Sequence, residues 1–355
     1  ITTRGGDVLL RGGSATASAL ADPTTNFSSF STAMQNTGAQ ITFTSSGSIT
    51  TAGGDIELRG ISGTIGGSAV NDGLKLTAGT LSSGAGNVRL YGLSASAAAG
   101  NGVTLSGSSA TKVSSTTGII TVMGGSRATT SGAGVMIDSG ATATSTNGSI
   151  KLIGAGSAST AGSNHGVVVN GGTVTLTGGT GTLTVTGQGG AGATNYGVYF
   201  SDATVTSAAT GVMAINGTGG SGTGANYGTY IADSTVSSAS DSVTSISGIG
   251  GGSGTGANHG VYLTGSTLSV TGAGELQIIG TGGEGTSGNT GVYASNSTIT
   301  SASTGRTMIS GQGRGSSSGT GNNHGVYMSG STVTTTGPGE LSIDGTGGTG
   351  SGYTH

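Results

Sequence analysis

The feature that most constrains this chain is a repeat of about 32 residues. A motif of Asn, one variable residue and Gly recurs six times in register, with spacings of 31, 31, 32, 31 and 34 residues. The motif begins at Asn164, Asn195, Asn226, Asn258, Asn289 and Asn323. A fixed period of this size, filled with short apolar alternations, marks one supersecondary unit that stacks on copies of itself. The repeat therefore predicts a solenoid.

Each repeat resolves into three strands, because apolar and polar residues alternate with period two. After the Asn motif, the aliphatic Val261 and Leu263 flank Tyr262, which points outward. A second segment places one aliphatic residue between Thr or Ser residues. A third closes on Gly, after apolar pairs such as Leu276 and Ile278, and this pattern recurs eleven times.

Three short strands, each with one inward face, can bury that face only by winding into coils. We therefore expect an all-β parallel β-helix (β-solenoid) of about 11 coils of 31–33 residues, with three strands per coil. Parallel crossovers are generally right-handed, so the helix is expected to be right-handed.

Composition excludes several other classes of protein. The net charge is −3 and no Lys/Arg cluster occurs, so the chain lacks the electrostatic footprint of a nucleic-acid-binding protein. The sequence contains no run of 18 apolar residues, so no transmembrane helix is predicted. The chain has no Cys and therefore no disulfide framework, and no cofactor is predicted.

The domain organisation expected is one continuous β-solenoid over residues 1–355, with the most regular repeats over 164–355. Residues 13–37 break the period and predict an inserted loop in the first full coil, with Phe27 and Phe30 as candidate contacts. The loop either braces the rod or carries a binding function. Both ends fall inside a coil, which favours a window of a longer array or ends that stack on neighbouring subunits.

The six Asn residues predict a structural column, because stacked Asn side chains can hydrogen-bond amide to amide along the axis. The alternative is a row of ligands for a sugar or a cation. The next column mixes His165, His259 and His324 with Tyr and Thr, so no two His fall in adjacent coils. Coils two apart separate these His by ~10 Å, so no metal site is predicted.

Outward Tyr residues in five successive coils predict an aromatic stripe. Such a stripe either stiffens one face by cross-strand stacking or docks another copy, a glycan or a covering loop. It comprises Tyr199, Tyr230, Tyr262, Tyr293 and Tyr327.

A second outward surface, the threonine face, resembles the Thr-x-Thr arrays of β-solenoid ice-binding proteins. Thr is also a favoured residue on any solvated strand face, which is the plainer interpretation. The array fades before residue 173 and comprises Thr173, Thr175, Thr204, Thr206, Thr235, Thr267, Thr298, Thr300, Thr332 and Thr334.

No catalytic residues are predicted. Glu275 and Glu340 lie two coils apart, which does not give the spacing of a carboxylate pair. Asp202 and Asp233 fall in adjacent coils without a basic partner in their column, and a solvated pair is the plainer interpretation. The chain is therefore not expected to be an enzyme.

Segments such as Ile49-Thr50-Thr51-Ala52-Gly53-Gly54-Asp55-Ile56-Glu57-Leu58 and Gly86-Asn87-Val88-Arg89-Leu90 resemble the repeat cores of filamentous-haemagglutinin-like exoproteins. These are large bacterial adhesins of the two-partner-secretion type. The resemblance implies a secreted or surface-anchored β-helix that serves adhesion, biofilm or matrix structure. We therefore expect a structural extracellular filament that self-associates; the alternatives are a carbohydrate-binding adhesin and an ice-binding protein.

Overall fold

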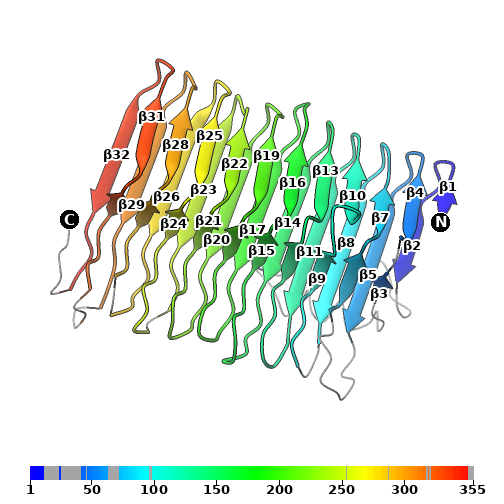
Figure 1. The fold of residues 1–355 in the computed structure, drawn as a ribbon, viewed down its shortest axis with the longest axis horizontal. Helices are drawn as coiled ribbons and strands as arrows, with labels where there is room; N and C mark the ends of the chain where they lie inside the picture. Colours follow the sequence, from blue (N-terminus) through cyan, green and yellow to red (C-terminus); the bar gives the residue numbers. More distant parts are fainter. Residues whose placement is uncertain are drawn as a thin grey trace.

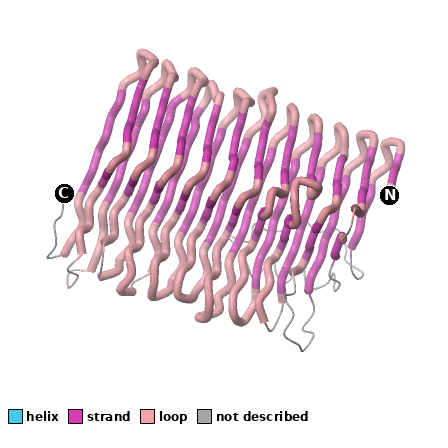
Figure 2. The backbone as a smooth tube through the Cα atoms, viewed as in Figure 1, coloured by secondary structure: helices cyan, strands magenta, loops and turns pink. Residues whose placement is uncertain are grey.

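The computed structural model describes residues 1–11, 24, 41–44, 46–62, 72–95, 98–252, 254–286, 288–316, 319 and 321–350. Over these ranges the chain consists of strands joined by loops and turns, without a helix (Figure 2). Accordingly, no membrane-spanning helix occurs in the described ranges. The coils stack along the longest axis of the molecule, with the first and last strands, β1 and β32, at opposite ends (Figure 1). The predicted all-β parallel β-solenoid is confirmed.

Three parallel sheets, here named A, B and C, run the length of the rod, and each coil contributes one strand to each sheet. Sheet A holds the Thr-rich segments: β1 (Thr2–Thr3), β4 (Ser48–Thr51), β7 (Thr80–Ser82), β10 (Lys112–Ser115), β13 (Thr142–Ser145), β16 (Thr173–Leu176), β19 (Thr204–Ser207), β22 (Thr235–Ser238), β25 (Thr267–Val270), β28 (Thr298–Ser301) and β31 (Thr332–Thr335). Sheet B holds the segments that close on Gly: β2 (Val8–Arg11), β5 (Ile56–Ser62), β8 (Val88–Ser94), β11 (Ile120–Ser126), β14 (Ile150–Ala155), β17 (Leu183–Gln188), β20 (Met213–Thr218), β23 (Val243–Ile249), β26 (Glu275–Thr281), β29 (Thr307–Gln312) and β32 (Leu341–Thr346). Sheet C holds the segments that follow the Asn motif: β3 (Ile41–Phe43), β6 (Leu74–Thr77), β9 (Val103–Ser106), β12 (Val135–Asp138), β15 (Val167–Asn170), β18 (Val198–Ser201), β21 (Thr229–Ala232), β24 (Val261–Thr264), β27 (Val292–Ser295) and β30 (Val326–Ser329).

The predicted number of coils is slightly too large. Sheets A and B have 11 described strands each but sheet C has ten, so ten coils carry all three strands. The final coil contributes only β31 and β32. Three strands per coil agrees with the expectation from the sequence.

The core is a set of aliphatic columns that run along the axis between the three sheets. Val198, Val261 and Leu263 are at most 1% exposed, while Tyr262 faces outward, as the period-two alternation predicts. Each buried Val, Leu or Ile contributes roughly 1.5–3 kcal/mol. Thr229 interrupts one Val column, and its buried hydroxyl donates to the carbonyl of Ser247 at 2.6 Å, which satisfies its polar group.

The Gly near the end of most sheet B strands is required by a close approach within the coil. A Cβ added to Gly217 would lie 2.0 Å from the carbonyl oxygen of Gly228, the Gly of the following Asn motif. Likewise, a Cβ added to Gly187 would lie 1.9 Å from the carbonyl oxygen of Gly197. The two Gly columns therefore let the end of sheet B pack directly against the start of sheet C.

The expected inserted loop, residues 13–37, lies outside the described residues apart from Thr24, and so do Phe27 and Phe30. The proposal that it braces the rod or binds a partner stays a prediction. The right-handedness of the helix also stays a prediction.

Candidate functional site

In-register stacking turns each position of the repeat, buried or outward, into a column of side chains along the rod. A candidate site in this molecule is therefore a column or a pair of columns. Four such candidates follow from the sequence: the asparagine column, the tyrosine stripe, the neighbouring His-containing column and the threonine face.

The structure places the six Asn of the repeat motif in one buried column, the asparagine column, in which every residue is at most 1% exposed. Asn195 donates through Nδ2 to the Oδ1 of Asn226 at 2.8 Å, and Asn226 donates to the Oδ1 of Asn258 at 3.2 Å. The ladder continues from Asn258 to Asn289 and from Asn289 to Asn323, each at 3.2 Å.

The asparagine column also fixes the Gly-rich corner of each coil. The Nδ2 of Asn226 donates to the carbonyls of Gly222 and Gly224 at 2.9 and 2.7 Å. One side-chain amide therefore bonds both to the next Asn along the axis and to the Gly-rich corner of its own coil. Because these side chains are fully buried and hydrogen-bonded within the protein, they are not accessible to an external sugar or cation. The column is structural in this fold.

The tyrosine stripe (Tyr199, Tyr230, Tyr262, Tyr293 and Tyr327) follows the outward face of sheet C. Tyr199 and Tyr230 stack with ring centroids 5.2 Å apart and planes inclined by 11°, and Tyr230 and Tyr262 stack at 5.0 Å and 16°. Tyr293 contacts Tyr262 and Tyr327 at 4.9 Å on each side. The rings are half-buried except Tyr327, which is 36% exposed.

A second column of rings interlocks with the stripe, and the sequence analysis did not identify it as part of this surface. We name it the His/Tyr column, and its members are His165, Tyr196, Tyr227, His259, Thr290 and His324. Tyr196 and Tyr227 stack almost parallel, 5.0 Å apart and inclined by 5°. Each also meets Tyr230 of the stripe edge to face, at 5.1 and 5.4 Å.

The signal for this second column was present in the sequence. Each of its members lies three residues before the stripe position of the same coil, as Tyr196 does before Tyr199. Because the column mixes His with Tyr and Thr, the sequence analysis considered it only as a possible metal site. In the described part of the chain no group of three or more His, Cys, Asp or Glu could hold a metal ion.

Two His of this column act as hydrogen-bond acceptors between coils. Nδ1 of His165 accepts from the backbone N–H of Tyr196 at 3.0 Å, and Nδ1 of His259 accepts from the N–H of Thr290 at 3.2 Å. The proton of each neutral ring therefore resides on Nε2. Burial lowers the pKa of His165 to about 4 and that of His259 to about 3.

Burial also opposes ionisation of three phenol groups of the surface. It raises the pKa of Tyr230 to about 12, and it raises the pKa of Tyr196 and Tyr227 above their ordinary value. The neighbouring Tyr hydroxyls add to each increase. The surface is thus an uncharged array of aromatic rings with hydroxyl and imidazole N–H groups among them.

The threonine face lies on the outward side of sheet A, where Thr204 pairs in register with Thr173 and Thr235. Thr206 donates to the hydroxyl of Thr175 at 3.1 Å. The two Thr columns extend one coil further toward the N-terminus than the sequence pattern indicated. Their additional members are Thr142 and Thr144 of β13, which pair with Thr173 and Thr175.

The two Asp residues in adjacent coils have a structural place in this fold. Asp202 and Asp233 occupy the turn between sheets C and A with φ of 49° and 48°, a left-handed conformation that Asp tolerates better than most residues. Asn296 holds the same place with φ of 47°, and Gly265 with φ of 59°. The backbone conformation of this turn accounts for the residue types in the column.

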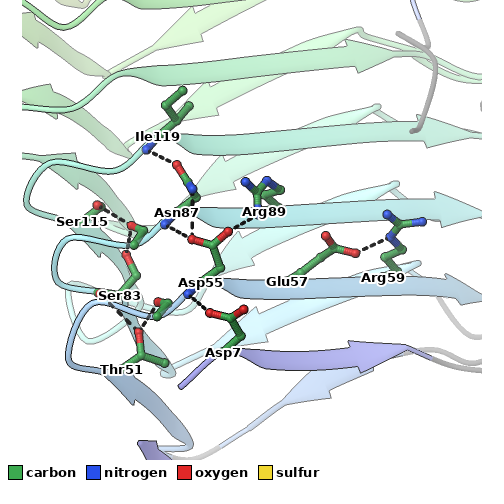
Figure 3. Close-up of polar contacts among 12 residues, drawn as sticks. Asp7, Thr51, Asp55, Glu57, Arg59, Ser83, Asn87, Arg89, Ser115 and Ile119 are labelled. Carbon is green, nitrogen blue, oxygen red and sulfur yellow. Dashed lines mark hydrogen bonds and ion pairs between the residues drawn. The ribbon is translucent and has the colours of Figure 1, made fainter. Parts of the chain in front are cut away.

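The N-terminal coils carry a separate polar ladder (Figure 3). Oδ1 of Asp7 accepts from the backbone N–H of Asp55 at 2.8 Å, Asp55 from that of Asn87 at 2.7 Å, and Asn87 from that of Ile119 at 2.9 Å. Burial opposes ionisation of Asp55, but its hydrogen bonds with Asn87 and Arg89 outweigh it and lower the pKa of the carboxyl. This ladder joins coils just as the asparagine column does.

A scan against protein-family models, a search of curated proteins and a search of solved structures each found no match to this chain.

Proposed function

We propose that this chain is a non-enzymatic structural segment of an extracellular bacterial fibre or surface filament. It would serve as a scaffold for adhesion, biofilm or matrix, in the manner of filamentous-haemagglutinin-like exoproteins. In this proposal the protein is secreted, resides at the cell surface or in the matrix, and self-associates into filaments or bundles.

The observation that carries the proposal is the continuity of the stack. Sheets A and B each run through 11 described strands in parallel register, and the asparagine column adds a buried hydrogen-bond ladder along the same axis. A rod of this kind spans about 50 Å at ~4.8 Å per coil. Its outward positions are dominated by uncharged residues, with only 6% charged residues in the whole chain, which suits lateral packing of many rods.

Electron cryomicroscopy of the secreted fraction of the source cells tests this proposal, with antibody against the chain to identify the rods. We expect labelled rods with a 4.8 Å axial repeat, joined into filaments or bundles outside the cell. Recovery of the chain only from the cell interior, as isolated short rods, would contradict it.

A second candidate function is carbohydrate binding by the tyrosine stripe, in which the rod acts as an adhesin. The observation that favours it is a continuous, half-exposed row of aromatic rings that extends over five coils of an uncharged surface. Exposed apolar patches of this extent commonly have a partner.

The matched test replaces Tyr230, Tyr262 and Tyr293 with Val, the residue at the equivalent position of β15 (Val168). If the stripe binds glycans, the triple variant should lose retention on a glycan array while it keeps its circular dichroism spectrum. Equal retention of the two proteins would remove the stripe from consideration.

A further inference from the structure

The His/Tyr column has one gap. Its rings stack without interruption from His165 through Tyr196 and Tyr227 to His259, with centroid distances of 4.8, 5.0 and 5.1 Å. The next coil then supplies Thr290 in place of a ring, and the column resumes one coil later at His324. The stripe beside it continues with a changed orientation: the ring of Tyr293 is inclined by 76° to that of Tyr262 and lies 4.9 Å from His259, so Tyr293 forms one wall of the gap.

The missing ring leaves an open slot of about 430 Å³ on the surface of the rod. Thr290 is 1% exposed, and His259 is 6% exposed. The stripe residues Tyr293 and Tyr327 line the slot, together with His259 and His324. Ala257, Gly288, Gly321 and Asn322 complete the lining, which contains no carboxylate and no Lys or Arg.

The dimensions of the slot follow from the coil spacing. His259 and His324 belong to coils two apart, so they are separated by ~10 Å along the axis. One planar ring placed midway would lie ~5 Å from each, which is the spacing of offset-stacked aromatic pairs. The same spacing is observed where a ring is present, since Tyr227 lies 5.0 Å from Tyr196 and 5.1 Å from His259.

The chemistry of the lining also matches a phenol. Burial holds the pKa of His259 at about 3, so its ring is uncharged at neutral pH, and its Nε2–H is left as a donor because Nδ1 accepts from Thr290. A neutral aromatic ring with one hydroxyl would stack on the neighbouring rings and keep its hydroxyl at the polar mouth. The fold itself places this group at the equivalent position in two coils, as Tyr196 and Tyr227.

We propose that the slot at Thr290 is a binding site for a monocyclic phenol. The ligand completes the aromatic column in the coil between His259 and His324, where the chain supplies Thr290 in place of a ring. This site does not depend on the proposed role of the chain as a fibre.

The test measures binding of p-cresol, the side-chain analogue of Tyr, by equilibrium dialysis and by ligand-observed NMR. We expect one p-cresol bound per chain in the millimolar to submillimolar range. Thr290→Tyr fills the slot with the chain's own phenol ring and should weaken binding at least tenfold. Because Tyr already occupies this position in two other coils, the variant should keep the circular dichroism spectrum of the parent.

A gain-of-site variant makes the test independent of any loss of fold. Tyr227→Thr opens the same kind of slot between Tyr196 and His259 and should raise the bound p-cresol from one to two per chain. Absence of p-cresol binding to the parent, equal binding by Thr290→Tyr, or unchanged stoichiometry in Tyr227→Thr would each overturn the proposal. Methyl β-D-glucopyranoside serves as the competing probe. If it binds the parent more tightly than p-cresol does, and if this binding is lost in Thr290→Tyr, the slot is a sugar site instead.

Discussion

Acid should loosen the coils that carry the buried His residues, well above the pH at which most carboxylates protonate. His259 accepts the backbone N–H of Thr290 through Nδ1 and stacks on Tyr227 at 5.1 Å. Protonation of Nδ1 removes the acceptor and places a charge in a site that is 6% exposed. The pKa of His259 is therefore held at about 3 in the folded coil, and the pKa of His165 at about 4, by burial.

The sign and size of the effect follow from proton linkage. The pKa of His259 in the folded coil lies below the value of 6.5 for an unperturbed His. Between these two values the opened coil binds a proton and the closed coil does not. The stabilisation is complete above pH 6.5 and is lost as the pH falls toward 3. At pH 5 the loss is about 2 kcal/mol, because each unit below 6.5 costs about 1.36 kcal/mol. His165 adds a contribution of the same sign.

Hydrogen exchange is the suitable assay, because a stacked-repeat protein opens locally and not in one two-state step. The opening free energy is followed from pH 8 to pH 5 at the amides of the His259 coil, after correction for the intrinsic exchange rate. His259→Tyr is the matched variant, since Tyr stands at the equivalent position in Tyr196 and Tyr227. We expect the parent to lose about 2 kcal/mol more than the variant over this range.

The reasoning would be refuted by equal pH dependence in the parent and His259→Tyr. A variant that unfolds at pH 8 would not answer the question. In that case His259→Gln, which offers an uncharged acceptor at a similar position, serves as the second comparison.

Three further outcomes test other parts of the structure. Asn226→Ala removes two ladder bonds and the donors to the Gly222 and Gly224 carbonyls, so we expect a loss of about 2–4 kcal/mol in local opening free energy, measured by hydrogen exchange. Val261→Asp places an unpaired carboxylate in a fully buried column and should unfold the adjacent coils, seen as lost β-sheet circular dichroism; a well-folded variant would contradict the inward register. For the threonine face, thermal hysteresis and ice-shaping assays of the parent come first: activity that disappears in Thr235→Lys would support ice binding, and an inactive parent would exclude it.

The backbone architecture was predictable because period-two alternation and in-register repetition act together. A shift of one residue in register would move every apolar side chain of a strand to the outward face. The alternation around Val261 and Leu263 therefore fixes which face is buried. The predicted number of coils was slightly too large, because the prediction counted eleven copies of one strand pattern. The last described coil has two strands, so ten coils have all three. The sequence shows that Gly recurs near the strand ends. The reason is a property of the packed coil, because a Cβ added to Gly217 would lie 2.0 Å from the carbonyl oxygen of Gly228.

The candidate site was only half predictable. The tyrosine stripe follows from alternation along a strand, but the His/Tyr column lies in the turn before it, where no alternation applies. Which rings meet across that turn depends on side-chain direction, and Tyr196 meets Tyr230 of the next coil as well as Tyr199 of its own. Similarly, Ala143 replaced the aliphatic residue between Thr142 and Thr144, which hid one coil of the threonine face from the sequence pattern.

Four residues at the turn position that looked mixed in the sequence follow one physical rule in the structure. Toward the N-terminus the same turn position holds Asp72 and Asn101, and the side chain of each accepts the backbone N–H of the equivalent residue one coil later, at 2.7 and 2.8 Å. His165 and His259 do the same through Nδ1. Parallel stacking fixes the position of that N–H relative to the side chain one coil before it. Side chains whose acceptor atom lies within hydrogen-bond distance of the N–H can therefore replace one another. The choice among Asp, Asn and His then decides how a coil responds to pH, because an Asn acceptor does not titrate, whereas a buried His ceases to accept once it is protonated.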